Sequence, residues 1–485
     1  MKKLLIIFFV SVLFASCDDF LDVNEDPNNP TVVTPELVLP VAQVYTGEYV
    51  LDYDMANHLG NMLMYNWSET YGFSWYQEEF DYLVSTTFHD DLFDDAYLYC
   101  LKHYKDLYDR EEKYNNYRAI SMIMMAYHFQ MLVDFYGDVP YTEALARGGN
   151  PTPKYDQAEA VYDSIMIQLD DAIQLINSES TSEVAFESVV NDVIFDGDMK
   201  KWKQFANTIK LRILVREANV KGDTYVTAEI AKITAEGSGY ITSDVLVNPG
   251  YLKETNKQNP FWDSFGEDSS GNTTMNHNAT CATQFIIDYL VSTGDPRIDT
   301  LFQKGPDSET HLGVEQGVVN LTSDYDQTHV SLIGAGLLKG YDAGAPIFTL
   351  AESYFNQAEA ALNGFGGNAK DLYENGVKAS FSYLGTEGVE DYLSQNIANV
   401  SWDYSNNKLE AIITQKWLGL MGVNAEQSWF DYTRTGFPSN LPISLQADTE
   451  DRPVRLFYPN SEITGNTKNV PSQKDAFTDK IFWAE

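Results

Sequence analysis

Several common catalytic signatures are missing from this chain of 485 residues. It has only three cysteines, Cys17, Cys100 and Cys281, and they form no C-x-x-C pair. The seven histidines form neither H-x-H nor H-E-x-x-H, and no G-x-S-x-G turn or Walker-type glycine loop occurs. These absences argue against zinc, nucleotide and catalytic-triad chemistry. We therefore expect no catalytic residues, no metal and no cofactor.

Positive charge is also scarce. Lysine and arginine number 32 against 71 acidic residues, which gives a net charge of −39. Such a surface repels the phosphate backbone of nucleic acids, so a nucleic-acid partner is not expected. Because 44% of the residues are apolar and 13% are aromatic, the chain has the composition of a large globular protein and not of an acidic disordered tail.

Only one long hydrophobic run occurs, from Leu4 to Phe14, after Lys2 and Lys3. It has about half of the roughly 20 residues that a membrane-spanning helix needs, which is typical of a secretory signal. The run ends in Ala15-Ser16-Cys17, so residues 1–16 are predicted to be a lipoprotein signal peptide and Cys17 the acylated residue. The alternative is an ordinary secretory signal with an unmodified Cys17. Without Lys2 and Lys3, 30 basic residues remain against 71 acidic ones, a net charge of −41.

After Cys17, residues 17–34 are rich in Asp, Asn and Pro and are predicted to form an acidic tether. Residues 35–485 are predicted to be one helical domain, because apolar residues recur at spacings of three and four over most of it. Helices are expected over 35–50, 91–110, 116–133, 158–176, 199–217, 347–362, 373–384 and 409–421. Asp156 and Glu159 form a candidate capping box before the fourth of these helices.

Between about 240 and 340 the helical pattern fades into Gly, Asn, Asp, Ser and Thr, so we expect long loops around one helix near 281–291. The pair at 347–384, joined by "GFGG" and rich in Ala, favours helical hairpins of the tetratricopeptide type. The predicted fold class is therefore all-α, with tetratricopeptide-like helix pairs and long irregular loops. "FDGDM" at 195–199 lacks the later ligands of a calcium loop, so Asp198 is interpreted as a helix cap.

The stretch "YNWSETYGFSWY" at 65–76 is the leading candidate for ligand contact, since it follows neither helical nor strand periodicity. Flat rings beside amides and hydroxyls suit sugars, which stack on aromatic faces and form hydrogen bonds. We expect ligand stacking by Trp67, Tyr71, Trp75 and Tyr76, with Trp262 from the loop-rich region. Hydrogen bonds are assigned to Asn66, Asn272 and Asn276. The alternative is that these rings fill the protein core.

Seven segments, in order, resemble the SusD/RagB family of nutrient-binding outer-membrane lipoproteins. They are "SCDDFLDVNEDPNNPT" after the signal, "DFYGDVPYTEAL" at 134–145, "IFDGDMKKWKQFANTIKLRILVR" at 194–216, "DPRID" at 295–299, "FTLAESYFNQAEAAL" at 348–362, "ITQKWLGLMGVNAEQSWFDYTRTGFP" at 413–438 and "RPVRLFYPNSEITGN" at 452–466. The resemblance implies a lipid-anchored protein on the extracellular face of the outer membrane. It also implies a non-catalytic binder of glycans, sometimes of peptides, whose partner is a SusC-like TonB-dependent transporter.

Three functions remain open at this point. The first is glycan binding and delivery to such a transporter, and the second is peptide binding by the same architecture. The third is a helical glycosidase that uses carboxylates of the cluster Asp90, Asp91, Asp94 and Asp95, which would need an acid and a base or nucleophile. The same cluster also suits a solvated helix N-terminus, where negative charge is favourable.

Overall fold

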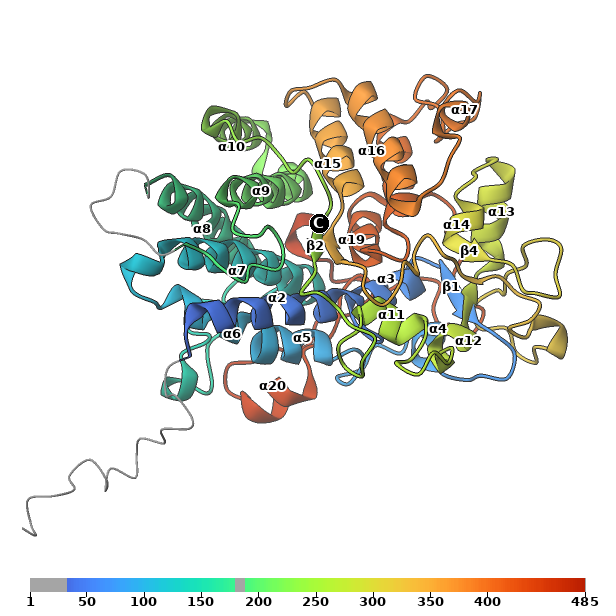
Figure 1. Ribbon diagram of the computed structural model, residues 1–485, viewed down its shortest axis with the longest axis horizontal. Helices are drawn as coiled ribbons and strands as arrows, with labels where there is room; N and C mark the ends of the chain where they lie inside the picture. Colours follow the sequence, from blue (N-terminus) through green and yellow to red (C-terminus); the bar gives the residue numbers. More distant parts are fainter. Residues whose placement is uncertain (1–32, 179–187, 485) are drawn as a thin grey trace, which may run out of the picture.

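Helices account for most of the described chain, residues 33–178 and 188–484 of the computed structural model (Figure 1). The longer helices are α2 (Pro35–Leu51), α3 (Ala56–Leu63), α7 (Asn115–Tyr136), α8 (Ala158–Ser178), α9 (Met199–Lys221), α10 (Asp223–Glu236), α13 (Gln284–Ser292), α15 (Leu350–Leu362), α16 (Ala369–Leu384), α18 (Lys408–Leu420) and α19 (Ala425–Thr435). The predicted signal peptide, Cys17 and the tether up to residue 32 lie outside the described residues. Within these ranges, no helix is both long and apolar enough to cross a membrane.

Shorter helices connect these elements. They are α4 (Gln77–Asp81), α5 (Asp91–Asp95), α6 (Lys102–Tyr108), α11 (Pro260–Phe265), α12 (Met275–Ala279), α14 (Ile298–Leu301), α17 (Val389–Leu393) and α20 (Asn460–Gly465), with the segments η1 (Ala96–Leu101), η2 (Glu112–Tyr114), η3 (Arg147–Gly149), η5 (Ser323–Tyr325) and η6 (Phe482–Ala484). The helix expected over 91–110 is thus three segments, because residues 96–101 form a π-helical turn. Its apolar stripe is nevertheless buried at Cys100, Leu101, Tyr104 and Leu107.

Helix capping explains where α9 begins. The side chain of Asp198 accepts hydrogen bonds from the backbone N–H groups of Lys200 and Lys201, which satisfies donors that the first helical turn leaves unpaired. This confirms Asp198 as a cap. The capping box predicted for α8 is wrong: the Asp156 carboxylate accepts from the Thr142 N–H at 2.7 Å, and the N–H of Ala158 donates to Asp138 at 2.9 Å.

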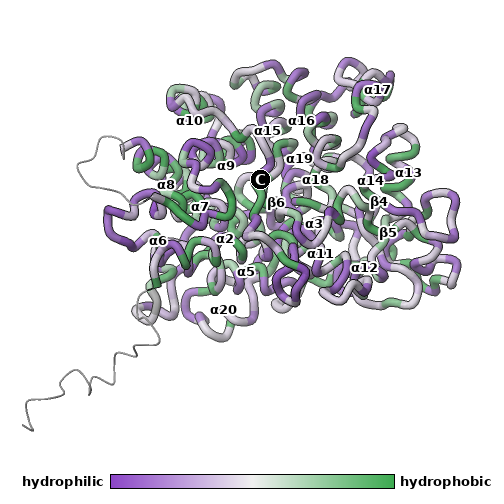
Figure 2. Tube along the Cα trace, viewed as in Figure 1, coloured by the Kyte–Doolittle hydropathy of each residue, from purple (hydrophilic) through white to green (hydrophobic). Residues whose placement is uncertain are grey.

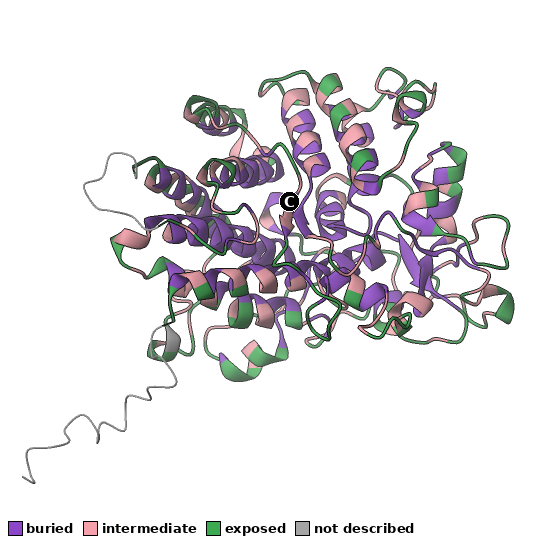
Figure 3. Cartoon of the chain, in the orientation of Figure 1, coloured by how far each residue is buried: buried purple, intermediate pink, exposed green. Residues whose placement is uncertain are grey.

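Successive helices pack side by side around a large core, as α7–α8, α8–α9, α9–α10 and α15–α16 do. Helix α7 is buried along nearly its whole length (Figure 3), so its lack of a polar face reflects a central position and not a membrane. On α16, a Cβ at Gly376 would lie 2.7 Å from the Phe355 ring of α15. Glycine is therefore what allows this close approach. Figure 2 shows apolar residues concentrated on the faces that these helices turn toward one another.

Residues 240–340 are not only loops around one helix. They hold β2 (Val245–Val247), β3 (Thr280–Ala282), β4 (Phe302–Gln303) and β5 (Leu332–Ile333), while β1 (Trp67–Glu69) and β6 (Ala345–Phe348) lie outside this range. A four-stranded antiparallel sheet has the order β1-β3-β5-β4, and β2 pairs with β6. These strands are too short to give a period-two signal in the sequence. The larger sheet lies at the end of the long axis that is remote from residue 33 (Figure 1).

Candidate functional site

The aromatic stretch at 65–76 is divided between core and surface. Residues 65–70 and Tyr76 are buried, whereas Tyr71 and Trp75 are 43% and 41% exposed. The division follows from the sheet, because Trp67 pairs with Ala282 and the rest of β1 is enclosed beside β3. The chain then leaves the sheet, so residues 71–75 form an exposed loop.

Trp67 is a core residue, which corrects its assignment as a ligand-stacking ring. Its side chain is fully buried, with ring centroids 5.3 Å from Phe265 and 6.3 Å from Phe261, both on α11. On the other side it lies 6.3 Å from the ring of His58 on α3. No face of this indole is free to stack on a ligand.

Tyr76 and Asn66 are also internal, so their assignments to ligand contact are wrong. The Tyr76 hydroxyl lies 2.6 Å from the Thr280 hydroxyl of β3. The side-chain oxygen of Asn66 accepts a hydrogen bond of 2.7 Å from the indole N–H of Trp417 on α18. Buried polar groups need such partners, and these two residues use theirs to join the sheet and the helices.

The exposed loop keeps three rings at the surface. The rings of Phe73 and Trp75 meet edge to face at 5.0 Å and 83°, and Tyr71 lines the same cavity as Phe73. The loop is held at both ends, because the Tyr71 N–H donates to the Tyr325 carbonyl at 2.9 Å and the Trp75 N–H donates to the Glu69 carboxylate. These bonds fix the rings before a ligand arrives, which reduces the entropy lost on binding.

A cavity of about 290 Å³ opens beside this loop. Its walls come from the loop, from residues 314–321 and from Gln446. The lining residues are Ser68, Glu69, Tyr71, Gly72, Phe73, Ser74, Gln77, Phe80, Val314, Glu315, Gly317, Val318, Asn320, Leu321 and Gln446. The lining of the cavity therefore combines hydroxyl, amide and carboxylate groups with aromatic rings. Burial raises the pKa of Glu69 above its usual range, and Glu315 accepts a hydrogen bond of 2.8 Å from the Tyr65 hydroxyl.

The second predicted loop does not contribute to this cavity. Trp262 is half-buried, with its ring packed over Gly266 so closely that a Cβ there would lie 2.7 Å from it. Asn272 is exposed but donates to Asp268 at 3.0 Å within its own turn, and Asn276 is half-buried. The wall that sequence reasoning missed is the segment 314–321, whose single glycine and scattered polar residues gave no periodic signal.

A larger groove of about 1090 Å³ lies near residue 33, at the opposite end of the molecule. Two of its basic groups are paired with carboxylates: Lys105 with Asp109, and Arg110 with Asp106. Of its two aromatic residues, Phe93 is buried and Tyr97 is half-buried, with its hydroxyl donating to a backbone carbonyl. This groove therefore presents no exposed ring for stacking.

The carboxylates considered for glycosidase chemistry begin α5. Asp94 accepts a hydrogen bond of 2.7 Å from the Ser461 hydroxyl. Burial, together with the charges of Asp91 and Asp94, raises the pKa of Asp95 to about 6. None of the four lines either of the two cavities described above.

Comparison with known proteins decides the family. Residues 27–459 match the sequence profile of the SusD-like family, described as starch-binding and associating with the outer membrane. The chain belongs to the SusD-like family. A chitin-binding SusD homologue from Flavobacterium johnsoniae is 23% identical, with a TM-score of 0.75 over 93% of this chain and 98% of that one. A SusD homologue from Bacteroides uniformis is also 23% identical, with a TM-score of 0.73 over 92% and 99%. The comparison with curated proteins gives no match.

Membership of the SusD-like family confirms two predictions from the sequence. The fold is all-α with tetratricopeptide-like helix pairs, because the solved SusD homologues superpose along nearly the whole chain. The protein is a binding protein and not an enzyme, because the family is described by starch binding. A glycosidase role for the cluster at the start of α5 is therefore set aside.

Proposed function

We propose that this SusD-like protein binds oligosaccharides at the cell surface through the cavity beside Tyr71–Trp75. The observation that carries the proposal is an exposed ring in the cavity wall, Tyr71, followed by exposed Trp75 in the same anchored loop. The cavity also presents the polar side chains of Glu69, Gln77, Glu315 and Asn320. Rings cover the apolar face of a sugar, and the polar groups accept or donate hydrogen bonds to its hydroxyls. A chitin-binding protein of the same fold and the starch-binding description of the family support a glycan as the ligand class.

The size of the cavity limits how much of an oligosaccharide can enter it. At about 290 Å³ it is at the lower limit of the roughly 300–1,000 Å³ found for small-molecule sites. We infer that one or two sugar units occupy it while the rest of the oligosaccharide lies across the exposed rings. Since Glu69 and Glu315 are carboxylates, a basic peptide is the competing ligand.

Alanine at Tyr71 or Trp75 is expected to weaken glycan binding by about five- to tenfold, since one stacked ring contributes on the order of 1 kcal/mol. The melting temperature should stay within about 1 °C of the parent value, because neither ring is in the core. A glycan array that includes chitin and starch fragments, with basic peptides added, identifies the ligand. Isothermal titration calorimetry then measures the variants.

Tyr404 supplies the matched control, since it is 53% exposed and lines neither cavity. Tyr404→Ala should bind like the parent protein. If the double variant at Tyr71 and Trp75 also binds glycan with parent affinity, the site lies elsewhere. If only basic peptides bind, the ligand class is wrong while the position of the site is retained.

We also propose that acyl groups on Cys17 anchor the protein to the outer face of the outer membrane, where it delivers its ligand to a SusC-like TonB-dependent transporter. The family's association with the outer membrane supports this location. A binder anchored at the outer face also needs a channel for uptake, because binding alone does not carry the ligand across the membrane.

Cys17→Ala is expected to remove the protein from the membrane fraction or to leave it unprocessed, because acylation is what retains it. Protease added to intact cells should cleave the parent protein and not the variant. Mild-detergent extracts of parent membranes should yield the transporter in a pull-down. Normal surface display of the variant would contradict the anchor, and recovery of the lipoprotein alone would contradict the partnership.

A further inference from the structure

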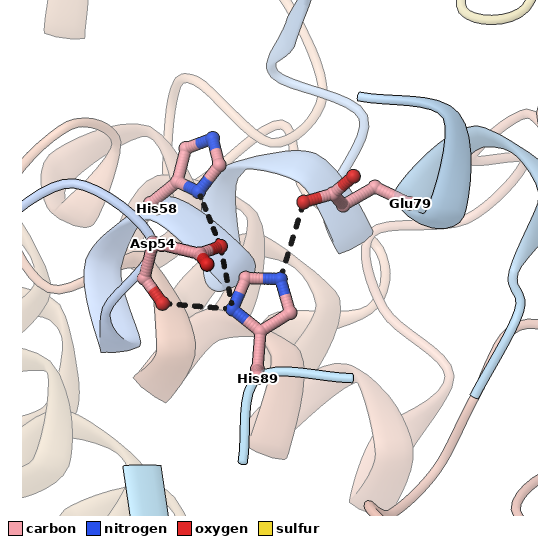
Figure 4. Close-up of side chains that lie close together, drawn as sticks. All are labelled: Asp54, His58, Glu79 and His89. Atoms are coloured by element: carbon pink, nitrogen blue, oxygen red, sulfur yellow. Dashed lines mark hydrogen bonds and ion pairs between the residues drawn. The ribbon is translucent and has the colours of Figure 1, made fainter. Parts of the chain in front are cut away.

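Two histidines and two carboxylates from separate segments, none of which lines the ring cavity, converge at one place (Figure 4). Asp54 lies between α2 and α3, His58 on α3, Glu79 on α4, and His89 two residues before α5. One ligand atom from each residue lies within 4.8 Å of the ligand atom of every other. His58, Glu79 and His89 are buried, whereas the Asp54 side chain is 53% exposed.

His58 is one of the buried polar side chains that the protein fold leaves without a partner, and the only one of these four residues in which both side-chain polar atoms lack one. Its side chain has no exposed surface, and neither ring nitrogen has a hydrogen-bond partner among the described residues. Its Nδ1 points toward the Asp54 carboxylate at 3.8 Å (Figure 4), which is too long for a hydrogen bond. A buried polar group without a partner is rare and calls for a specific cause, such as an ion that occupies the gap.

We propose that Asp54, His58 and His89 form a binding site for a divalent transition metal, with Zn²⁺ as the preferred ion. The Asp54 Oδ1 lies 3.2 Å from Nδ1 of His89 and 3.8 Å from Nδ1 of His58. Zinc bonds of about 2.0–2.1 Å in a tetrahedron separate neighbouring ligand atoms by about 3.4 Å. These two distances are close to the spacing that one ion requires, and imidazole with carboxylate suits Zn²⁺.

Glu79 acts in this site as a positioning residue. Its Oε1 lies 3.2 Å from Nε2 of His89, the nitrogen opposite the one that faces Asp54. A carboxylate that accepts from the far nitrogen of a metal-binding histidine fixes the ring and its tautomer. Because Asp54 is exposed, water can complete the coordination and the ion can enter from solvent.

Without metal, Nδ1 of His89 also lies at hydrogen-bond distance, 2.8 Å, from the backbone carbonyl of Asp54. Burial alone would lower the pKa of His89, but the hydrogen bond to Glu79 and the charge of Asp54 raise it to about 9. A bound ion would take the place of this backbone hydrogen bond at Nδ1 of His89 and would give His58 a partner. Bound metal would join α3 to the turn before α5, and Glu79 connects that turn to α4 through His89. Helix α4 begins directly after the ring loop and Tyr76.

The test is a metal titration of the purified, tag-free protein. Co²⁺ should bind at one equivalent with the visible absorption of a tetrahedral N/O site, and Zn²⁺ should displace it and raise the melting temperature. His58→Phe should abolish the Co²⁺ spectrum; its ring neighbours Tyr53 and Phe265 favour an aromatic side chain there, so the variant should fold. Asp54→Asn should weaken Zn²⁺ binding at least tenfold.

Two further variants separate the roles. Glu79→Gln should retain the Co²⁺ spectrum while weakening Zn²⁺ affinity about 10- to 100-fold, as expected of a positioning residue. His103→Gln, at a more accessible imidazole on α6, should bind like the parent protein. The proposal is overturned if no Co²⁺ absorption develops, or if folded Asp54→Asn and His58→Phe proteins bind metal as the parent does.

Discussion

Trp67→Ala is expected to lower the free energy of unfolding by about 3–5 kcal/mol, the range for truncating a buried aromatic residue. The indole is fully buried against Phe265, Phe261 and His58, so its removal leaves a cavity between α3, α11 and the sheet. Urea denaturation followed by circular dichroism measures the change. Trp75→Ala, eight residues away, should unfold at nearly the parent midpoint.

The alanine variants of Trp67 and Trp75 are therefore expected to behave in opposite ways. Trp67→Ala should lose stability and keep glycan binding, whereas Trp75→Ala should keep stability and lose glycan affinity. The folded fraction of Trp67→Ala should bind glycan normally once the protein is kept below its melting temperature. A Trp67→Ala protein that unfolds like the parent but loses glycan affinity would contradict the structure. That result would mean that Trp67 is a ligand-stacking ring at the surface, as predicted from the sequence.

The sequence could not separate these rings because β1 is covered on both faces. Trp67 faces α3 and α11, whereas the hydroxyl of Ser68 donates to the carbonyl of Glu315 at 3.3 Å on the other side. All three residues of the strand are buried. A strand enclosed on both faces has no alternation of apolar and polar residues, and three residues are too few to show one.

Long helices were predictable for the opposite reason. The stripes of α9, α15, α16 and α18 repeat over thirteen or more residues each, and local caps such as Asp198 mark their starts. The second wall of the ring cavity was not predictable, since it depends on contacts between distant segments. The Tyr71 N–H reaches the Tyr325 carbonyl only because β3 lies between β1 and β5 in the sheet. No local pattern encodes that order.

The segments that identified the family carry a buried framework of ion pairs. Five of these seven segments together supply both residues of every pair. The pairs are Asp134–Arg216, Arg212–Glu352, Asp295–Arg297, Lys416–Asp431 and Glu359–Arg434. Every side chain in these pairs is at most 5% exposed. Charges are kept in a core only when partners satisfy them, so these segments specify how the helices dock and not what the protein binds.

Asp134→Ala is accordingly expected to destabilise the fold by about 3–5 kcal/mol, the range for breaking a buried ion pair. The Asp134 carboxylate accepts from Arg216, from the Tyr162 hydroxyl and from the indole N–H of Trp483 at 3.0 Å. Alanine would leave these three donors without this acceptor, and the Arg216 guanidinium would stay buried without its carboxylate. Thermal and urea unfolding of the purified variant measure the loss.

Two comparisons show whether the uncompensated charge is the cause. Glu390→Ala breaks an exposed pair with Lys378, whose Nζ lies 2.9 Å from the Glu390 carboxylate, and should leave the unfolding midpoint unchanged because solvent screens such pairs. Replacing Asp134 by Leu and Arg216 by Met together should recover part of the lost stability, since apolar side chains of similar size need no counter-charge. Recovery stays partial because Tyr162 and Trp483 still lack their acceptor. If Asp134→Ala unfolds at the parent midpoint, or if the double variant is no more stable than the single one, the buried pair does not hold α7 against α9.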